Sequence, residues 1–367
     1  MRSLLRLLAI NFGILLVLVI GLELIFGSWF SKVHALHQFT MPRDWVITGP
    51  NLLSGEPAET TYSRDSNGFR GLNGDIGAID IITVGGSTTD QRFLDDSQTY
   101  QAELIRLLNA AGHSAVIANA GIDGQSTFGH IHNFDSWFNR VDGLKTRYFL
   151  YYIGINDLVR IAQTDSYDAL EAKGWKLRAK LYIREKSAFY QMYRMFKSMY
   201  LDHGLGHSIN RTNIADAPPF ATKPLLGQIE TPEVRQAIVD LRARVRELNK
   251  LTVAFGAKAI FVTQRSAAWR RSAGDVVGVE SVSGGFESEL VGQFGPMNGV
   301  DIYRIERLVA DGIMAECTAV GAVCFDLMED VDFDPTRDFY DSIHTNASGS
   351  AVIAKYLSEK LIAAGIF

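Results

Sequence analysis

Cysteine is scarce in this 367-residue chain, which contains only Cys317 and Cys324. Two cysteines cannot build the disulfide framework of a small secreted domain, and they do not form a metal-binding set. Their position on either side of a predicted helix-to-strand turn favours two small buried side chains. A disulfide between them stays open, because the compartment inferred below would permit one.

Several catalytic signatures are also absent. The eight histidines include no HExxH pattern, and His130 and His132 are expected to be surface residues rather than metal ligands. The stretch GGSTT at residues 85–89 lacks the Gly-Lys-Ser/Thr ending of a phosphate-binding loop. No GxSxG motif is present, which argues against an α/β-hydrolase proper. The sequence predicts neither a metal nor a cofactor.

The chain has no large excess of either charge. Its 36 basic and 41 acidic residues give a formal net charge of −5, and no basic patch is interleaved with aromatic residues. Nucleic acid is therefore not an expected partner. A hydrophobic content of 47% supports a substantial core, in one large domain or two small ones.

One long apolar run lies near the N-terminus, LLAINFGILLVLVIGLELIF at residues 7–26. Its length is about the twenty residues that a helix needs to cross a bilayer. Asn11 and Glu23 are its strongly polar members, each near an end where the side chain reaches the interface. Trp29 and Phe30 follow as interfacial anchors. The run predicts a transmembrane helix.

The expected topology is that of an uncleaved signal anchor. Arg2 and Arg6 precede the apolar run, and basic residues stay on the cytoplasmic side, so the rest of the chain would lie in the periplasm or outside the cell. Cleavage after VHA at residues 33–35 is an alternative, although cleavable signals have shorter apolar runs of about 7–15 residues. A buried helix of a soluble domain fits poorly, because the run is apolar on every face.

Strand-like and helical patterns alternate after residue 78. The predicted strands are 78–85, 114–121, 147–154, 257–264 and 322–327, and the predicted helices are 98–112, 231–256, 302–321 and 346–364. This alternation predicts βαβ units, a parallel sheet and helices on both of its faces.

The expected domains are a cytoplasmic tip and anchor at 1–30, a juxtamembrane segment at 31–77, and a sheet domain at 78–367 with an insertion at about 158–230. Within the insertion, SAFYQMYRMFKSMY at 187–200 is predicted to form a helix that packs on the core. A substrate-covering lid or a contact with the membrane surface are the alternatives. The Gly- and Ser-rich loop at 265–300 is expected to shape the rim of the site.

Four segments place polar residues just after predicted strands. Ser87 follows the first strand, Gly124 the second and Asn156 the third, while Asp341 and His344 come one loop after the fifth. Ligands of a parallel sheet bind outside the carboxyl ends of its strands, so these residues are expected to converge. A serine nucleophile needs an imidazole to take its proton and a carboxylate to orient that imidazole. Ser87, His344 and Asp341 are the candidates.

The oxyanion of an acyl-transfer intermediate requires preorganised hydrogen-bond donors. Backbone N–H groups of Ser87 and Gly124, with the side-chain amide of Asn156, are the candidate donors. Each candidate residue also has a structural alternative: a helix cap for Ser87, a turn for Gly124, a second cap for Asn156, and an ion pair for Asp341 with His344. Asp157 is assigned a structural role. The presence of all four segments in order favours catalysis.

The segments VGGSTTD, NAGIDG, YIGIND and DSIHTNASGSAVIA resemble the four sequence blocks of the SGNH (GDSL-like) hydrolase superfamily. The resemblance covers residue 78 to the C-terminus, apart from the insertion. It implies a three-layer α/β/α flavodoxin-like fold with about five parallel strands. It also implies Ser87 as nucleophile, Asp341 and His344 as its triad partners, and Ser87, Gly124 and Asn156 as oxyanion donors.

One residue departs from the family pattern. Gly86 stands where the family has an aspartate before the nucleophile, so a carboxylate and its hydrogen bonds are missing. Asp90, one helical turn further on, is a candidate to replace part of that structure. The departure concerns the rate and the geometry of the turn more than the class of reaction.

The expected function is that of a membrane-anchored extracytoplasmic serine esterase or deacylase, acting on O-acyl esters of a carbohydrate or a lipid. An O-acyltransferase that uses the same acyl-enzyme at Ser87 is one alternative. A catalytically silent envelope protein that binds glycans or scaffolds assembly is another, and Gly86 is its best support.

Overall fold

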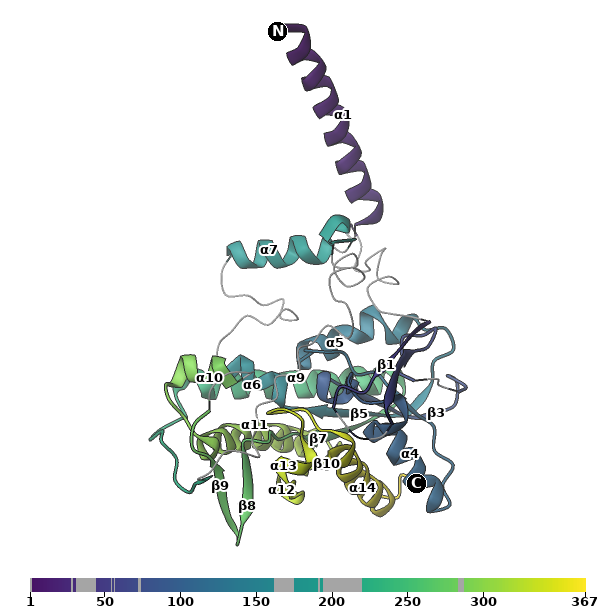
Figure 1. The fold of residues 1–367 in the computed structure, drawn as a ribbon. Coiled ribbons are helices and arrows are strands. Elements are labelled where there is room, and N and C mark those ends of the chain that lie inside the picture. The colour runs from purple at the N-terminus through teal and green to yellow at the C-terminus, as the bar shows by residue number, and fades with distance from the viewer. Residues whose placement is uncertain are drawn as a thin grey trace. The chain divides into compact units, whose positions relative to one another are not determined.

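A computed structural model of the chain describes residues 2–27, 29–30, 44–53, 55, 57–71, 74–161, 175–190, 192–193, 220–282 and 287–367. The chain divides into two compact units. The first comprises Met1–Arg43 and Ala169–His207, and the second comprises Asp44–Asp168 and Ser208–Phe367. Figure 1 shows both units, with the parallel sheet and its helices in the second.

The second unit is built on a parallel sheet. Its strands are β3 (Ile79–Gly85), β4 (Ile117–Asn119), β5 (Thr146–Ile153), β7 (Lys258–Thr263) and β10 (Val323–Phe325). They lie in the order β10-β7-β5-β3-β4, and every neighbouring pair is parallel. Numbered along the chain this is the flavodoxin-like order 2-1-3-4-5. The predicted fold class is therefore confirmed.

Helices cover both faces of the sheet (Figure 1). On one face α4 (Tyr100–Ala110) packs against α14 (Ala347–Ala363). On the other, α9 (Pro232–Phe255) packs against both α5 (Thr127–Ser136) and α11 (Gly299–Ala319). The helices predicted at 98–112, 231–256, 302–321 and 346–364 are present, with ends that differ by a few residues.

Strand β5 illustrates why the core strands are apolar throughout. Leu150 and Tyr152 belong to the core cluster that includes residues of α4 and α14. The alternate residues Phe149 and Tyr151 point to the opposite face, where the Tyr151 hydroxyl lies 2.5 Å from Oγ1 of Thr252 in α9. A strand covered on both faces has no polar side to present, so its sequence does not alternate.

The segment expected to be juxtamembrane belongs in part to the sheet domain. The part of it from Asp44 onward lies in the second unit, where β1 (Trp45–Pro50) and β2 (Glu59–Arg64) form an antiparallel hairpin. The boundary predicted at residue 78 thus differs from the structural division after Arg43. The sequence of β2, ETTYSR, gave no apolar alternation from which a strand could be predicted.

The loop expected at 265–300 contains a second small sheet. Strands β8 (Trp269–Ser272) and β9 (Asp275–Val279) pair with each other, and β6 (Phe220–Ala221) pairs with β9. Ala273 and Gly274 connect β8 to β9, and both have positive φ, 51° and 94°. Two positive φ values in a two-residue loop are typical of a type I′ hairpin turn.

The first unit contains the apolar N-terminal helix and part of the insertion. Helix α1 (Arg2–Phe26) includes a stretch, Ala9–Phe26, that is long and apolar enough to cross a membrane, and none of that stretch is buried. Helix α7 (Trp175–Lys186) comes from the insertion. The helix predicted over 187–200 lies largely outside the described residues, although 188–190 and 192–193 are helical.

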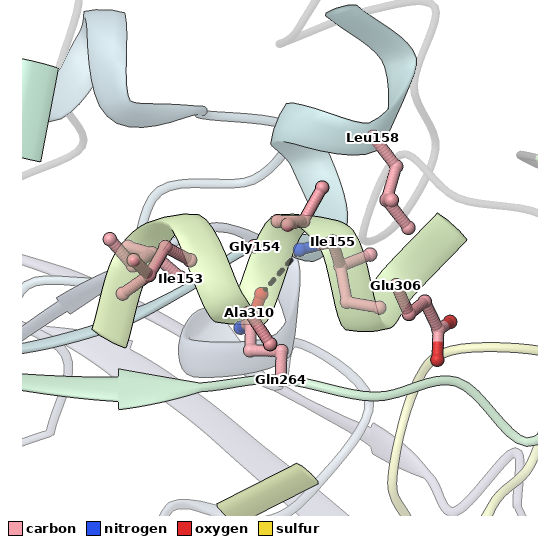
Figure 2. A pocket seen from close by; sticks show the side chains of 9 residues that line it. Ile153, Gly154, Ile155, Leu158, Gln264, Glu306 and Ala310 are labelled. Carbon is pink, nitrogen blue, oxygen red and sulfur yellow. Dashed lines mark hydrogen bonds between the residues drawn. The ribbon is translucent and has the colours of Figure 1, made fainter. Parts of the chain in front are cut away.

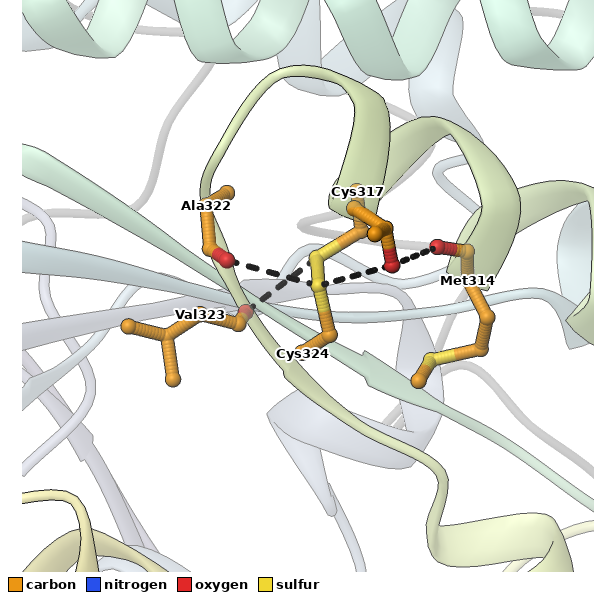
Figure 3. The surroundings of a disulfide bond; sticks show 6 residues. Met314, Cys317, Ala322, Val323 and Cys324 are labelled. Carbon is orange, nitrogen blue, oxygen red and sulfur yellow. Dashed lines mark hydrogen bonds between the residues drawn. A yellow bond between two sulfur atoms is a disulfide. The ribbon is translucent and has the colours of Figure 1, made fainter.

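Cys317 and Cys324 form a disulfide, so the expectation of two unpaired buried cysteines was wrong (Figure 3). The bond links the last turn of α11 to the start of β10, and the two Cα atoms lie 6.0 Å apart. This distance is within the usual disulfide range. The turn between helix and strand brings the two residues together, which their spacing in the sequence did not reveal.

We expect this disulfide to stabilise the folded domain moderately. It closes a short loop, with a sequence separation of 7, and chain-entropy arguments give about 2 kcal/mol for such a loop. The double variant Cys317→Ser/Cys324→Ser should lower the free energy of unfolding in urea by that amount. A reducing agent should lower the free energy of unfolding of wild type and leave that of the double variant unchanged. If a thiol reagent alkylates Cys317 and Cys324 in wild-type protein that has been denatured without reduction, the disulfide is absent and the prediction is contradicted.

Candidate active site

The candidate nucleophile lies in a tight turn at the end of β3. Helix α3 (Ser87–Asp90) begins directly after Gly86, which is its N-cap residue. Close packing requires both preceding glycines. A Cβ atom on Gly85 would overlap Oγ1 of Thr89, and one on Gly86 would overlap Nδ2 of Asn156. The turn therefore has no room for a side chain before the serine.

Three side chains form a continuous hydrogen-bonded chain at this turn. Oγ of Ser87 lies 2.7 Å from Nε2 of His344, and Nδ1 of His344 lies 2.7 Å from Oδ2 of Asp341. Ser87 follows β3, whereas Asp341 and His344 precede α14. His344 lies 257 residues after Ser87 in the sequence. If Nδ1 carries the proton, it donates to the carboxylate and Nε2 accepts from the hydroxyl.

The Asp341 carboxylate is fixed from both sides. Its other oxygen, Oδ1, accepts hydrogen bonds from the backbone N–H groups of Ile343, at 2.9 Å, and His344, at 2.7 Å. Burial alone raises the pKa of Asp341, but the hydrogen bond and the charge of His344, with these backbone donors, bring the pKa below its ordinary value. Asp341 is therefore ionised at neutral pH and can orient the imidazole.

Gln91 joins the nucleophile turn to the histidine loop. It caps the C-terminal end of α3 in a left-handed conformation, with φ 48°. Its Nε2 donates to Oγ1 of Thr345 at 3.1 Å and to Oγ of Ser350 at 2.6 Å, while Oε1 accepts from the backbone of Tyr100 at 2.8 Å. Because Thr345 directly follows His344, Gln91 couples the positions of the two reacting side chains. Sequence reasoning missed this residue.

Gln264, which follows β7, was also missed. Its Nε2 donates to Oγ1 of Thr88 at 2.7 Å and to the carbonyl of Tyr152 at 2.9 Å. Its Oε1 accepts from the backbone N–H of Ile155 at 2.9 Å, the bond drawn in Figure 2. Gln264 therefore holds the turn after β3 against the turn after β5.

Gln264 also lines a narrow crevice, whose lining residues are drawn in Figure 2. Its walls come from the end of β5, from α6 (Ile155–Ile161) and from α11, and they include the buried carboxyl of Glu306. The crevice is too narrow to hold a water molecule. Ser87 and His344 do not line it, so we do not assign it to a substrate.

The candidate oxyanion donors lie on segments that are bonded to one another. Nδ2 of Asn156 donates to the carbonyl of Gln125 at 2.6 Å, and the same Nδ2 occupies the space beside Gly86. Gln125 ends a turn in which its N–H donates to Ile122 at 3.1 Å. Within that turn Gly124 has φ 69°, the left-handed conformation that glycine adopts without strain.

Asp90 was the candidate to replace the missing acid, and the structure gives it a different set of partners. It is fully buried and accepts hydrogen bonds from the Tyr62 hydroxyl at 2.9 Å and from Nη2 of Arg64 at 2.8 Å. Arg92 also contacts it, at 3.3 Å. Asp90 thus anchors the β1–β2 hairpin beneath α3, and the amide of Asn156 fills the space beside Gly86.

Two further assignments concern residues near these segments. Asp157 accepts a hydrogen bond from Oγ1 of Thr127 at 2.6 Å and pairs with Arg244 at 3.3 Å, which agrees with its structural assignment. His132 is exposed as expected. His130 is buried, with Nδ1 3.3 Å from Oε1 of Gln125, so the expectation of a surface residue was wrong. Its place on the inner side of α5 explains the difference.

Comparison with known proteins finds only distant similarity. No family model matches the chain, and no curated protein matches it. The crystal structure of TesA is 14% identical, with a TM-score of 0.40 over 77% of this chain and 97% of the other.

Two further solved structures are similar to the same extent. A variant of Axe2, an acetyl xylan esterase from Geobacillus stearothermophilus, is 13% identical, with a TM-score of 0.38 over 77% of this chain and 94% of the other. A member of the lipolytic protein G-D-S-L family from Veillonella parvula DSM 2008 is 12% identical, with a TM-score of 0.40 over 77% of this chain and 97% of the other. The chemistry proposed below rests on the residues of this chain.

Proposed function

We propose that this protein is a membrane-anchored serine esterase or deacylase that acts outside the cytoplasm on O-acyl esters of a carbohydrate or a lipid. The observation that carries the proposal is the hydrogen-bonded chain from Ser87 through His344 to Asp341. It lies at the carboxyl end of β3, beside β5, where the strand order of the sheet reverses. Parallel sheets bind their ligands at this switch point.

The reaction follows from the geometry. Nε2 of His344 takes the Oγ proton while Oγ of Ser87 attacks the acyl carbon, and Asp341 stabilises the imidazolium that forms. The imidazolium then gives its proton to the departing alkoxide, leaving an acyl group on Ser87. A water molecule, deprotonated by His344, attacks this ester in turn and releases the carboxylic acid and the free serine.

The oxyanion of each tetrahedral intermediate would be held by the N–H groups of Ser87 and Gly124 and by the amide of Asn156. An amide nitrogen carries two hydrogens, and one of those on Nδ2 of Asn156 is donated to Gln125. That bond fixes the orientation of the amide, and we assign the second hydrogen to the oxyanion. The left-handed Gly124 lets the backbone come close to a ligand.

Two observations support a location outside the cytoplasm. Helix α1 contains a stretch suited to a membrane, preceded by Arg2 and Arg6. The disulfide between Cys317 and Cys324 is typical of oxidising compartments. Together they favour an N-terminus in the cytoplasm and a catalytic domain on the other side.

Covalent labelling by a fluorophosphonate tests the proposal. We expect the full-length, detergent-solubilised protein to be labelled, and Ser87→Ala to remain unlabelled, because the activated hydroxyl is the site of attack. Ser136→Ala is the matched control, since the Ser136 hydroxyl bonds to the backbone of its own helix and should leave labelling intact. Equal labelling of wild type and Ser87→Ala, or no labelling of wild type, would favour a catalytically silent protein.

A further inference from the structure

A cluster of polar and aromatic side chains joins the end of α1 to the end of α7 within the first unit. Glu23, in the last turn of α1, accepts hydrogen bonds from Oγ of Ser187 at 2.5 Å and from the backbone of Ala188 at 3.0 Å. It also accepts one from Nε1 of Trp29 at 2.9 Å, and the Trp29 ring meets Tyr182 of α7 edge-on. The C-terminal half of α7 therefore packs beside the end of the apolar helix.

Helix α7 exposes an apolar and aromatic face. Trp175, Ala179, Tyr182 and Ile183 recur at helical spacing and share one side of the helix. Trp175 is 76% exposed, and Tyr182 and Ile183 are each about half exposed. Large apolar side chains gathered on one exposed face indicate a surface that another apolar phase covers.

Basic residues are frequent in the same helix. The sequence of α7, WKLRAKLYIREK, contains five basic residues and one acidic residue, in a chain whose formal net charge is −5. Lys176 and Lys180 are exposed, and the ammonium of Lys186 lies 5.9 Å from the centre of the Tyr182 ring. Tryptophan and tyrosine favour the headgroup region of a bilayer, and lysines are attracted to anionic headgroups.

We propose that α7 is an interfacial helix that lies on the anionic phospholipid surface of the membrane crossed by α1. The proposal rests on the proposed membrane-spanning role of α1. Because Glu23 lies near the end of the apolar stretch, the residues bonded to it meet the membrane at headgroup level. The hydrogen bonds also satisfy a carboxylate that would otherwise be costly at that depth. Figure 1 shows α7 running crosswise to α1, as a helix on a membrane surface would.

Quenching of tryptophan fluorescence by lipids with brominated chains tests the proposal on the full-length protein. The chain has five tryptophans, so the quenching of Trp175 is obtained by subtracting that of Trp175→Phe from that of wild type. The quenching of Trp29 is obtained in the same way from Trp29→Phe. In bilayers that contain phosphatidylglycerol, we expect each variant to lose part of the quenching seen in wild type. Trp29 reports insertion of α1, and Trp175 reports contact of α7 with the lipid.

A charge-reversal variant tests the role of the lysines. We expect the glutamate variant, Lys176→Glu/Lys180→Glu/Lys186→Glu, to lose the quenching that comes from Trp175 and to keep the quenching that comes from Trp29. Loss of each lysine charge weakens attraction to an anionic surface roughly fivefold. The matched control, Lys176→Arg/Lys180→Arg/Lys186→Arg, keeps the positive charges and should be quenched as wild type is. Bilayers of phosphatidylcholine alone should also weaken the Trp175 contribution. Circular dichroism of all variants verifies that they fold.

The outcomes separate the two proposals. Quenching of Trp29 without Trp175 would overturn the interfacial role of α7 and leave the membrane anchor standing. Quenching of neither residue would overturn both. Unchanged Trp175 quenching in the glutamate variant, or equal quenching in phosphatidylcholine, would overturn the assignment of anionic lipid as the partner of α7.

Discussion

His344→Ala is expected to lower kcat for ester hydrolysis by roughly 10⁴- to 10⁶-fold, with a much smaller change in KM. The imidazole lies 2.7 Å from the Ser87 hydroxyl, where it can accept the hydroxyl proton and return it to the leaving group. Without it the hydroxyl remains a weak nucleophile at neutral pH. Steady-state turnover of short-chain acyl esters measures the loss.

Asp341→Asn should cost about 10⁴-fold in kcat, because an amide no longer fixes the tautomer of His344. The matched control is His132→Ala, which removes an exposed histidine and should leave turnover unchanged. A rate for His344→Ala within tenfold of wild type would be incompatible with the proposed mechanism. Ser87→Ala combined with His344→Ala should lose no more activity than either change alone, since the two residues act as a unit.

The second large effect is expected at Gly86. Placing an aspartate before the nucleophile, by Gly86→Asp, should lower activity rather than raise it. A Cβ atom there overlaps Nδ2 of Asn156 and lies 2.9 Å from the carbonyl of Gln125. The smaller change Gly86→Ala should also displace the side-chain amide of Asn156. Loss of one oxyanion donor costs about 10²–10³-fold in kcat, and we expect a loss of that size for Gly86→Ala and for Asn156→Ala.

The double variant Gly86→Ala/Asn156→Ala makes this prediction specific. If the alanine at 86 acts by displacing Asn156, the double variant should lose little more activity than Asn156→Ala alone. Gly292→Ala is the control, since a Cβ atom there meets nothing within 4 Å. Fully additive losses, or a Gly86→Asp enzyme more active than wild type, would show that the space beside Gly86 is not limiting.

The sequence predicted the parallel sheet and the residues at its edge because both depend on local signals. Buried parallel strands appear as short apolar runs, and the polar residues that follow them must converge at one edge. The structure does bring Ser87, His344 and Asp341 into hydrogen-bond contact, and it places Asn156 beside Gly86. Their roles in catalysis remain proposals.

The features that could not be predicted depend on contacts between distant segments. Gln91 and Gln264 carry no motif, and only the folded chain shows that their side chains bond to segments far away in the sequence. Strand β2 has no apolar pattern because its buried Ser63 and Arg64 bond to carboxylates of distant residues, Asp96 and Asp90. The β8–β9 turn contains Ala273 at positive φ, a conformation that alanine rarely adopts and that no propensity predicts.

The burial of Asp90 bears on where a soluble version of this protein could begin. Its carboxylate is completely shielded from solvent and depends on Arg64 and Tyr62, which belong to β2. A fragment starting at residue 78 would keep Asp90 and Arg92 but discard Arg64 and Tyr62. Removing one partner of a buried ion pair is strongly destabilising, by about 3–5 kcal/mol. Removal of the anchor should therefore spare everything from Asp44 onward.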